Sequence, residues 1–408
     1  MYLGQLLQCP CLSRYNFLGA PVYVQTADGA GSMVGELLNM KDAGQRVDIE
    51  FTLALNNRTG KYFFCKDLID SAPDLVNSIL YWRVPLVDRP NNITARILGR
   101  LALYEVELRR SAPRLEAWTP LIKRPRPVIF MDPREVTFHQ LKAADCVVCH
   151  DVGPITHPDL YHPKVKSIYE KAFAKIYDAK LSIIFASHTS MSDFVGLYGD
   201  DFRSMVVISP PLRAMITDGP SEPLTGLTTP FLLTVGSIGV RKNQSCAIEA
   251  FRVSALADRG YSYVICGGPE PGFEKVAALA DETPGVVRPG YVSDDQLRWL
   301  YRNAAGFVLP SLLEGFGLPA AEAIAYDLVP LVTQGGALHE VTGDAAILVD
   351  PTDVIAIAKG LNRLVALSLE ERKERLRCLK LSASRFSAEA AHSKWRQALQ
   401  YALCQAAD

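Results

Sequence analysis

The sequence predicts an α/β fold made of two Rossmann-like, doubly wound domains. The chain has 408 residues, of which 49% are hydrophobic, and this suits two ordinary α/β domains better than one. From Phe231 to Leu367 the order strand, loop, helix repeats with short connections, as in a parallel sheet. Residues 219–229 are rich in turn-forming residues and lack hydrophobic periodicity, so we expect a linker there.

This linker separates a first domain, expected over residues 1–218, from a second domain over residues 230–385. A last helical segment over residues 386–408 could cross back to the first domain, or it could be a simple terminal helix of the second. In the second domain, apolar runs predict strands within Phe231–Gly236, Tyr261–Cys266, Val286–Val292 and Phe307–Leu309, and Asp294–Asn303 reads as a helix.

The first domain has a weaker pattern near its start. Its expected strands are Pro21–Gln25, Pro127–Met131, Asp145–Cys149, Ser182–Ala186 and Met205–Ile208. A loop at Asp28–Ser32, a helix at Met33–Lys41 and a helix at Pro163–Lys180 complete the expected elements. Cys146 and Cys149 lie within one of these strands, and their spacing favours core packing over metal binding.

Two carboxylates lie eight positions apart across the start of a helix. Phe307–Leu309 reads as a buried strand, Glu314 follows on the loop at its carboxyl end, and Pro319 suits the first turn of the helix that carries Glu322. Ligands bind at this edge of an open α/β sheet. An ordinary strand, turn and capped helix with solvated glutamates is the plain alternative.

The same loop contains Gly315 and Gly317, which allow a ligand to approach the backbone closely. Free amides at a helix start attract phosphate. A second loop, after the strand Phe231–Gly236, carries the adjacent cations Arg241 and Lys242. A guanidinium and an ammonium group can both bind phosphate oxygens, although for this pair taken alone a solvated basic pair before a helix is the stronger alternative.

Five motifs in a fixed order resemble the donor-binding half of retaining glycosyltransferases with the GT-B architecture, the glycosyl transferases group 1 family. The resemblance covers residues 230–385 and implies two domains that face each other across a cleft. One departure is Ser237, where many members have an arginine. The motifs are Gly236-Ser-x-x-x-Arg-Lys242, Gly267-Gly-Pro-Glu270, Gly290-Tyr-Val-Ser-Asp-Asp-Gln-Leu297, Pro310-Ser-x-x-Glu-Gly-Phe-Gly-Leu-Pro-x-x-Glu322 and Gly343-Asp-Ala-Ala-Ile-Leu-Val-Asp350-Pro.

The resemblance also implies roles for individual residues. Glu314 would touch the donor sugar at the reaction centre, Glu322 would hold the ribose hydroxyls, and Arg241 with Lys242 would bind the diphosphate. Residues 288–292 would flank the nucleobase. The donor-binding residues that it implies are Gly236, Arg241, Lys242, Val292, Gly315, Phe316, Gly317, Leu318 and Glu322.

In the first domain, His150 and Asp151 follow a buried strand and resemble a His-Asp element of the same family. His150 would then be the second catalytic residue, donating a hydrogen bond to a sugar hydroxyl or to developing charge. Asp151 could belong to the acceptor side, or it could simply orient the histidine or cap the next turn. The family places acceptor contacts on the loop that contains Gly29 and Gly31, where a plain turn is the stronger alternative.

Composition limits the other partners. The formal net charge of -1 argues against nucleic acid, which favours strongly basic surfaces. No run of about 18 apolar residues predicts a membrane span, and without a signal pattern we expect a cytoplasmic location with reduced cysteines. We find no metal site and expect no cofactor. An excess of basic residues over residues 96–126, and lysines around an apolar stripe over residues 164–180, could contact the inner face of the membrane.

The sequence therefore predicts a retaining transfer of a sugar from a nucleotide-diphosphate donor to a glycan or lipid-linked glycan acceptor. Similarity favours GDP-mannose as the donor and surface polysaccharide assembly as the process. Two alternatives stay open, a sugar-nucleotide epimerase with the same architecture and a non-catalytic protein that binds sugar nucleotides.

Overall fold

The computed structural model describes residues 46–56, 59–86, 90, 92–111, 124–212, 219–227 and 230–407. The chain divides into two compact units after Pro210. The first, here the N-terminal unit, contains most described residues up to Pro210 and also the last helix, which begins at Ala388. The second, here the C-terminal unit, extends from Pro211 to Ser387. The predicted linker falls inside this second unit.

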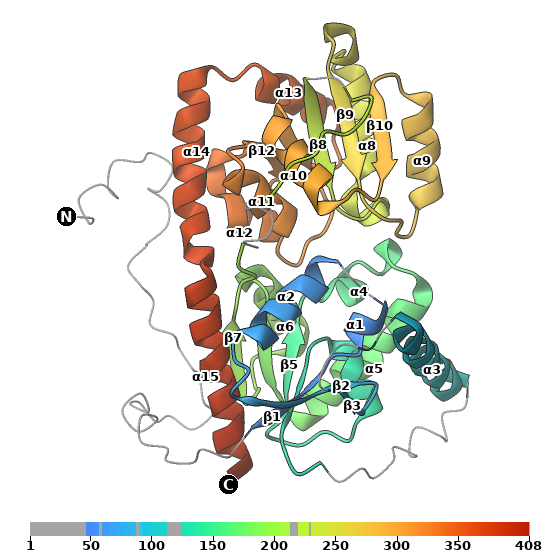
Figure 1. Ribbon diagram of the computed structural model, residues 1–408, viewed down its shortest axis with the longest axis vertical. Helices are drawn as coiled ribbons and strands as arrows, with labels where there is room; N and C mark the ends of the chain where they lie inside the picture. The colour runs from blue at the N-terminus through green and yellow to red at the C-terminus, as the bar shows by residue number, and fades with distance from the viewer. Residues whose placement is uncertain are drawn as a thin grey trace, which may run out of the picture. The chain divides into compact units, whose positions relative to one another are not determined.

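A six-stranded parallel sheet forms the centre of the C-terminal unit, with strand order β10-β9-β8-β11-β12-β13 (Figure 1). Its neighbouring central strands β8 and β11 are far apart in sequence. The order therefore reverses between them, which makes this the switch point of the sheet. The strands are β8 Phe231–Val235, β9 Ser262–Cys266, β10 Val286–Gly290, β11 Gly306–Leu309, β12 Pro330–Thr333 and β13 Ile347–Val349.

Helices connect these strands, as the alternating sequence pattern predicts. Their ends are set by local chemistry: Ser293 and Gln296 form a capping box at the start of α10, and Asp353 accepts two backbone hydrogen bonds at the start of α13. The helices are α8 Gln244–Val253, α9 Phe273–Glu282, α10 Asp294–Asn303, α11 Leu318–Ala325, α12 Gly336–Thr342, α13 Val354–Val365 and α14 Leu369–Ala383.

The described strands of the N-terminal unit form one seven-stranded sheet in the order β3-β2-β1-β4-β5-β6-β7. The edge strand β3 is antiparallel to β2, and the remaining pairs are parallel. The switch point of this sheet lies between β1 and β4. The strands are β1 Val47–Glu50, β2 Val76–Tyr81, β3 Val84–Leu86, β4 Val128–Phe130, β5 Cys146–Cys149, β6 Ser182–Phe185 and β7 Ser204–Val207.

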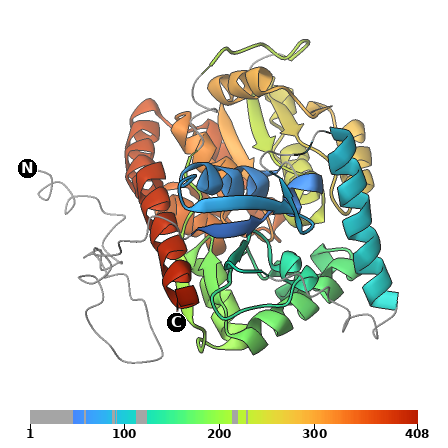
Figure 2. The same cartoon turned by 60° about the horizontal axis from the view of Figure 1, so that its bottom comes forward.

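The helices of the N-terminal unit include two long ones on opposite sides of it, α3 and α15 (Figures 1 and 2). Strands β1 to β3 have no counterpart among the predicted elements, whereas β4 to β7 match predicted strands within a residue or two at each end. The predicted elements between Pro21 and Lys41 lie outside the described residues. The helices are α1 Leu53–Asn56, α2 Gly60–Asp70, α3 Asn92–Ser111, α4 Gly153–Thr156, α5 Pro163–Ala179, α6 His188–Tyr198 and α15 Ala388–Ala407, with a 3-10 helix at Pro133–Phe138.

The last helix, α15, completes the core of the N-terminal unit. Trp395 and Leu399 are fully buried among residues of β1 and α2. Polar contacts fix the same helix, because His392 bonds Asp67 at 2.7 Å and Arg396 pairs with Asp74 at 2.6 Å. Among the described helices, none is long and apolar enough to cross a membrane. The prediction of an α/β fold with two parallel-sheet domains is confirmed, apart from the antiparallel edge strand β3.

Candidate active site

The loops after β8 and β11 meet at the switch point of the C-terminal unit. The amide of Leu312 donates to the carbonyl of Arg241 at 2.9 Å, which joins the two loops directly. Asn243, in a left-handed conformation with φ of 59°, donates from its side chain to the carbonyl of Pro310 at 3.0 Å. The two predicted segments are therefore held together by one backbone and one side-chain hydrogen bond, neither of which depends on a ligand.

Glu314 lies at the centre of this site. Its Oε1 accepts hydrogen bonds from Lys242 Nζ at 2.5 Å and from the Ser311 hydroxyl at 2.7 Å, and its Oε2 pairs with Arg241 at 3.4 Å. The side chains of Glu314 and Lys242 are only 8% and 7% exposed. A charge buried to this degree needs a partner, and here each of the two charges has one.

A second carboxylate completes the charge balance. Glu270 holds the other side of the Arg241 guanidinium at 3.0 Å, while its own Oε1 is buried without a partner among the described residues. Glu270 is brought here by β9, because the amide of Ile238 donates to the carbonyl of Gly268, and the amide of Glu270 donates to the carbonyl of Ile238. Two cations thus face two carboxylates.

The pKa values of the buried pair reflect this arrangement. Burial alone would raise the pKa of Glu314, but Lys242 and Arg241 outweigh it and hold that pKa below its ordinary value. Burial lowers the pKa of Lys242, and Glu314 opposes that shift. Glu314 is therefore an ionised carboxylate at neutral pH, shared between two cationic groups.

Close backbone approaches shape the surrounding loops. At Gly267 a Cβ would stand 1.8 Å from the carbonyl oxygen of Gly236, so only glycine allows the ends of β8 and β9 to meet. At Gly317 the backbone has φ of 99°, and a Cβ would stand 2.5 Å from the Leu338 side chain. Helix α11 begins at the next residue, Leu318, so its unbonded amides follow Glu314 closely in the chain.

The other predicted donor-binding residues have different surroundings. Glu322 is 3% exposed in α11, and its Oε2 accepts a hydrogen bond from the Tyr301 hydroxyl at 3.0 Å. The Phe316 ring is buried against Phe386, with centroids 5.0 Å apart, so the side chain serves packing rather than an exposed contact. Val292 packs partly buried against the core of the unit. Their roles toward a donor stay predictions.

In the N-terminal unit, His150 is 4% exposed directly after β5. Its Nε2 lies 2.9 Å from the Met131 carbonyl, and that oxygen can only accept, so Nε2 carries the proton. Burial lowers the pKa of His150 to about 4, which keeps the ring neutral at physiological pH. The remaining nitrogen, Nδ1, is then an acceptor. A hydrogen bond from His150 to a sugar stays a prediction, and it would require the N–H to leave the Met131 carbonyl.

Asp151 forms an ion pair with Lys61 of α2 at 3.1 Å, and its Oδ1 accepts from the amide of Gly153 at 3.0 Å. Asp151 therefore caps the turn into α4, while its predicted place on the acceptor side stays a prediction. Gly29 and Gly31 lie outside the described residues. Within the described part of the chain, no group of three or more histidine, cysteine, aspartate or glutamate side chains could hold a metal ion.

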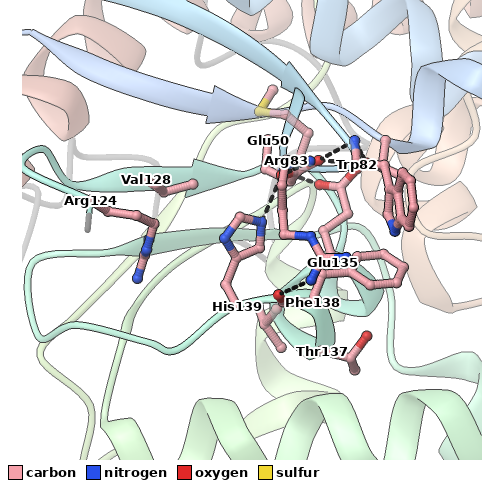
Figure 3. A network of polar contacts seen from close by, with 12 residues as sticks. Glu50, Trp82, Arg83, Arg124, Val128, Glu135, Thr137, Phe138 and His139 are labelled. Atoms are coloured by element: carbon pink, nitrogen blue, oxygen red, sulfur yellow. Dashed lines mark hydrogen bonds and ion pairs between the residues drawn. The ribbon is translucent and has the colours of Figure 1, made fainter. Parts of the chain in front are cut away.

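The switch point of the N-terminal unit contains a polar network that the sequence did not suggest (Figure 3). Glu50, at the end of β1, is fully buried and accepts from Thr52 at 2.5 Å and from the amide of Trp82 at 3.1 Å. It also pairs with His139 at 2.6 Å and lies 3.3 Å from the amide of Arg83. These contacts fix the turn between β2 and β3.

Beside it, Glu135 accepts hydrogen bonds from three backbone amides, those of Leu53, Met131 and Asp132. Burial, followed by the neighbouring charge of Glu50, raises the pKa of Glu135 well above its ordinary value. The carboxylates of this network are thus occupied mainly by the backbone that surrounds them.

Sequence reasoning found three residues that the structure brings together, Arg241, Lys242 and Glu314. Glu270 and Ser311 belong to the recognised motifs, but the sequence indicated no role for them. Both follow strands, β9 and β11, whose carboxyl ends lie at the same edge of the sheet. Sequence reasoning missed Glu50 and the network around it entirely, because an acidic residue inside a short strand carries no recognisable motif.

Comparison with known proteins agrees with the geometry. Residues 220–378 match the family model for glycosyl transferases group 1. The chain is 29% identical over 300 residues to O-antigen chain mannosyltransferase B of Escherichia coli, covering 68% of this chain and 76% of that protein. It is 30% identical over 263 residues to the serotype-specific mannosyltransferase WbdA of Escherichia coli, covering 60% of this chain, but it spans only 32% of that longer protein.

Solved structures share the fold at low identity. Sucrose-phosphate synthase from Thermosynechococcus elongatus superposes with a TM-score of 0.61 at 14% identity, over 87% of this chain and 98% of that one. A trehalose-6-phosphate structure from Escherichia coli, bound with UDP-2-fluoro glucose, gives a TM-score of 0.60 at 13% identity, over 87% and 99% of the two chains.

The fold is the GT-B architecture, and the matched family model and the named relatives support a glycosyltransferase. More particularly, residues 220–378 match the glycosyl transferases group 1 family, and relatives of the chain are named as mannosyltransferases.

Proposed function

We propose that this chain is a retaining glycosyltransferase that moves a sugar from a nucleotide-diphosphate donor to a hydroxyl of a glycan or lipid-linked glycan acceptor. The observation that supports this most strongly is the convergence of Arg241, Lys242 and Glu314 at the switch point between β8 and β11. Two cations beside the start of α11 suit a diphosphate.

The relatives support a choice of donor and process. Two of them are named as mannosyltransferases, one of an O-antigen chain, and a structure of the same fold holds UDP-2-fluoro glucose. The UDP-2-fluoro glucose complex supports a nucleotide-diphosphate donor in general, and the mannosyltransferase names lead us to propose GDP-mannose as the donor and polysaccharide assembly as the process.

In the proposed step, the bond between the sugar and the diphosphate breaks while the acceptor hydroxyl attacks from the same face. The acceptor proton passes to an oxygen of the departing diphosphate. Arg241 and Lys242 stabilise the negative charge that grows on that diphosphate, and such preorganised charge is usually the largest contribution to catalysis. Because these side chains supply the positive charge, the step needs no metal ion.

Glu314 has a positioning role in this proposal. Its carboxylate is already shared by Lys242, Arg241 and Ser311, and its lowered pKa makes it a weak base and a poor nucleophile. It holds both cations in place before the donor arrives. A diphosphate then competes with Glu314 for the same two partners, and the released carboxylate can face the sugar.

The test is transfer from GDP-mannose to an oligomannose acceptor, with NMR of the new anomeric centre. We expect a product whose anomeric configuration matches that of the donor, and Glu314→Gln should lower turnover about 100- to 1000-fold. Calorimetry should show that this variant binds GDP at least as tightly as the parent, because a competing charge has been removed. The matched control, Glu249→Gln, removes a partly exposed carboxylate on α8 and should leave turnover unchanged.

An inverted product would overturn the retaining mechanism. Undiminished turnover in Glu314→Gln would remove the role of Glu314. Incubation with GDP-mannose alone separates the alternatives: an epimerase forms a new nucleotide sugar without acceptor, and a pure binding protein changes no substrate at all.

A further inference from the structure

Helix α3 of the N-terminal unit has two unlike faces. Its inner face consists of small residues, Ala95, Gly99 and Ala102, which recur every three or four positions and are buried. Small side chains let α3 approach α1 closely, and these two helices are in direct contact. One acidic side chain also points inward, since Glu105 accepts a hydrogen bond from the Trp82 indole at 2.6 Å and pairs with Arg83.

The outer face of α3 is apolar and exposed. Ile97, Leu101, Tyr104 and Leu108 follow each other at spacings of four, three and four, so they form one stripe along the helix. Globular proteins expose single apolar residues commonly, but a continuous stripe of large ones marks an interaction surface. The exposed fractions are Ile93 72%, Ile97 54%, Leu101 43%, Leu103 61%, Tyr104 68% and Leu108 42%.

Positive charge borders this stripe. Arg96 and Arg100 are exposed on one flank of it. Glu105, the acid whose side chain is described on this helix, is held on the inner side by Trp82 and Arg83. The outward side of α3 thus combines large apolar groups with arginines.

The basic helix α5, which the sequence analysis paired with this region, does not offer such a surface. Its apolar stripe is turned inward, with Phe173 fully buried and Ile176 only 1% exposed. Lysines on α5 still face solvent, but Val165 and Ile168 of the stripe are at least half-buried, so this helix exposes less apolar surface than α3. Of the two predicted membrane contacts, the structure therefore favours α3.

We propose that α3 lies in the plane of an anionic membrane surface, with the stripe Ile97–Leu101–Tyr104–Leu108 at the level of the acyl chains. A 20-residue helix is about 30 Å long, and arginines on its flank reach the phosphate groups of the lipids. An apolar stripe alone could bind either a lipid layer or an apolar protein surface. The exposed arginines beside it favour an anionic lipid layer as the partner. This surface is independent of the proposed sugar transfer.

The experiment is flotation of the full chain with vesicles of equimolar phosphatidylglycerol and phosphatidylcholine, compared with vesicles of phosphatidylcholine alone. We expect binding to the anionic vesicles and much weaker binding to the neutral ones. Ile97→Gln with Leu101→Gln should weaken the binding at least about tenfold. Arg96→Gln with Arg100→Gln should weaken it roughly thirtyfold, since each arginine near such a surface contributes about a fivefold factor.

The matched control is Ile355→Gln with Leu369→Gln, which removes two apolar groups of similar exposure, 50% and 61%, from other helices. This control should bind vesicles like the parent chain. Circular dichroism melting should show that all variants are folded. The proposal fails if the parent chain does not bind anionic vesicles, or if the control loses as much binding as the α3 variants. It fails equally if α3 substitutions change only the oligomeric state in solution, because α3 would then bind a second copy of the chain.

Discussion

The two sheets of this protein each place a buried glutamate at their switch point, and the two glutamates are satisfied in opposite ways. Glu50, at the end of β1, is bonded to the backbone amides of Trp82 and Arg83 and to His139. Glu314, after β11, is bonded to the side chains of Lys242, Arg241 and Ser311. Both carboxylates are buried, and both have opposite charge or hydrogen-bond donors within reach.

The difference lies in whether the partners can be exchanged. The backbone amides of the turn cannot rotate away from Glu50 without a change in the backbone. A ligand that displaced Glu50 would therefore have to unfold the turn. The side chains around Glu314 can turn from the carboxylate to another anion without moving the backbone. A buried acid at a strand end is therefore not evidence of an active site by itself, whereas an acid held by mobile cations is.

The largest expected effect is on folding, from Glu50→Ala. Removing this carboxylate leaves His139 and two turn amides without their buried acceptor, and we expect a loss of about 3–5 kcal/mol in the free energy of unfolding. Trp82 and Arg83 both have positive φ, 53° and 69°, so the turn also loses the contact that holds it in an unfavourable conformation. Urea unfolding followed by circular dichroism measures this loss.

Anion rescue sharpens the contrast between the two glutamates. Saturating GDP should raise the melting temperature of Glu314→Gln by at least as much as that of the parent chain, because the freed cations accept the diphosphate. If Glu50→Ala unfolds in the same urea range as the parent chain, the network in Figure 3 does not stabilise the turn, and the distinction drawn above is wrong.

A smaller effect is expected on binding, from Lys242→Ala. Loss of one charged donor to the diphosphate should weaken GDP binding about 10- to 100-fold, which corresponds to about 1.5–3 kcal/mol. Isothermal titration calorimetry measures it directly. The control Arg252→Ala, at an exposed cation on α8 paired with Glu249, should bind GDP like the parent chain. Full GDP affinity in Lys242→Ala would contradict a phosphate role for this residue.

The smallest effect is a pH dependence at His150, which has a pKa of about 4 in the folded chain against an ordinary value of 6.5. The unfolded chain therefore binds an extra proton between these two values, and stability falls as the pH falls from 6.5 to 4. We expect His150→Asn to lessen this fall by roughly 1–3 kcal/mol. Urea unfolding at a series of pH values provides the measurement. An unchanged slope would mean that the ring is protonated in the folded state.

The sequence was sufficient to predict the C-terminal unit because its strands are continuous apolar runs and its site residues follow them directly. Arg241 and Glu314 are 73 residues apart, but each comes just after a central strand, so the topology alone brings them together. The sequence could not predict which carboxylate pairs with which cation in the site. That Glu270 binds the far side of Arg241 depends on how the β8 and β9 loops pack.

The N-terminal unit was harder for physical reasons. Strand β1 carries the buried acids Asp48 and Glu50, which local propensity disfavours in a strand. The turn between β2 and β3 has Trp82 and Arg83 at positions that normally select glycine, asparagine or aspartate. Tertiary contacts with Glu50 override both preferences. Lysines on α5 and arginines on α3 look alike in sequence, and only packing reveals which helix buries its apolar side.

The placement of α15 affects the order in which the two units can fold during synthesis on the ribosome. Its residues Trp395 and Leu399 belong to the core of the unit that is synthesised first, yet they are translated after the whole C-terminal unit. The core of the N-terminal unit therefore stays incomplete, with apolar surface exposed, until nearly the entire chain has emerged. Nascent chains arrested before residue 388 should thus remain sensitive to protease in the first half while the second half is already resistant.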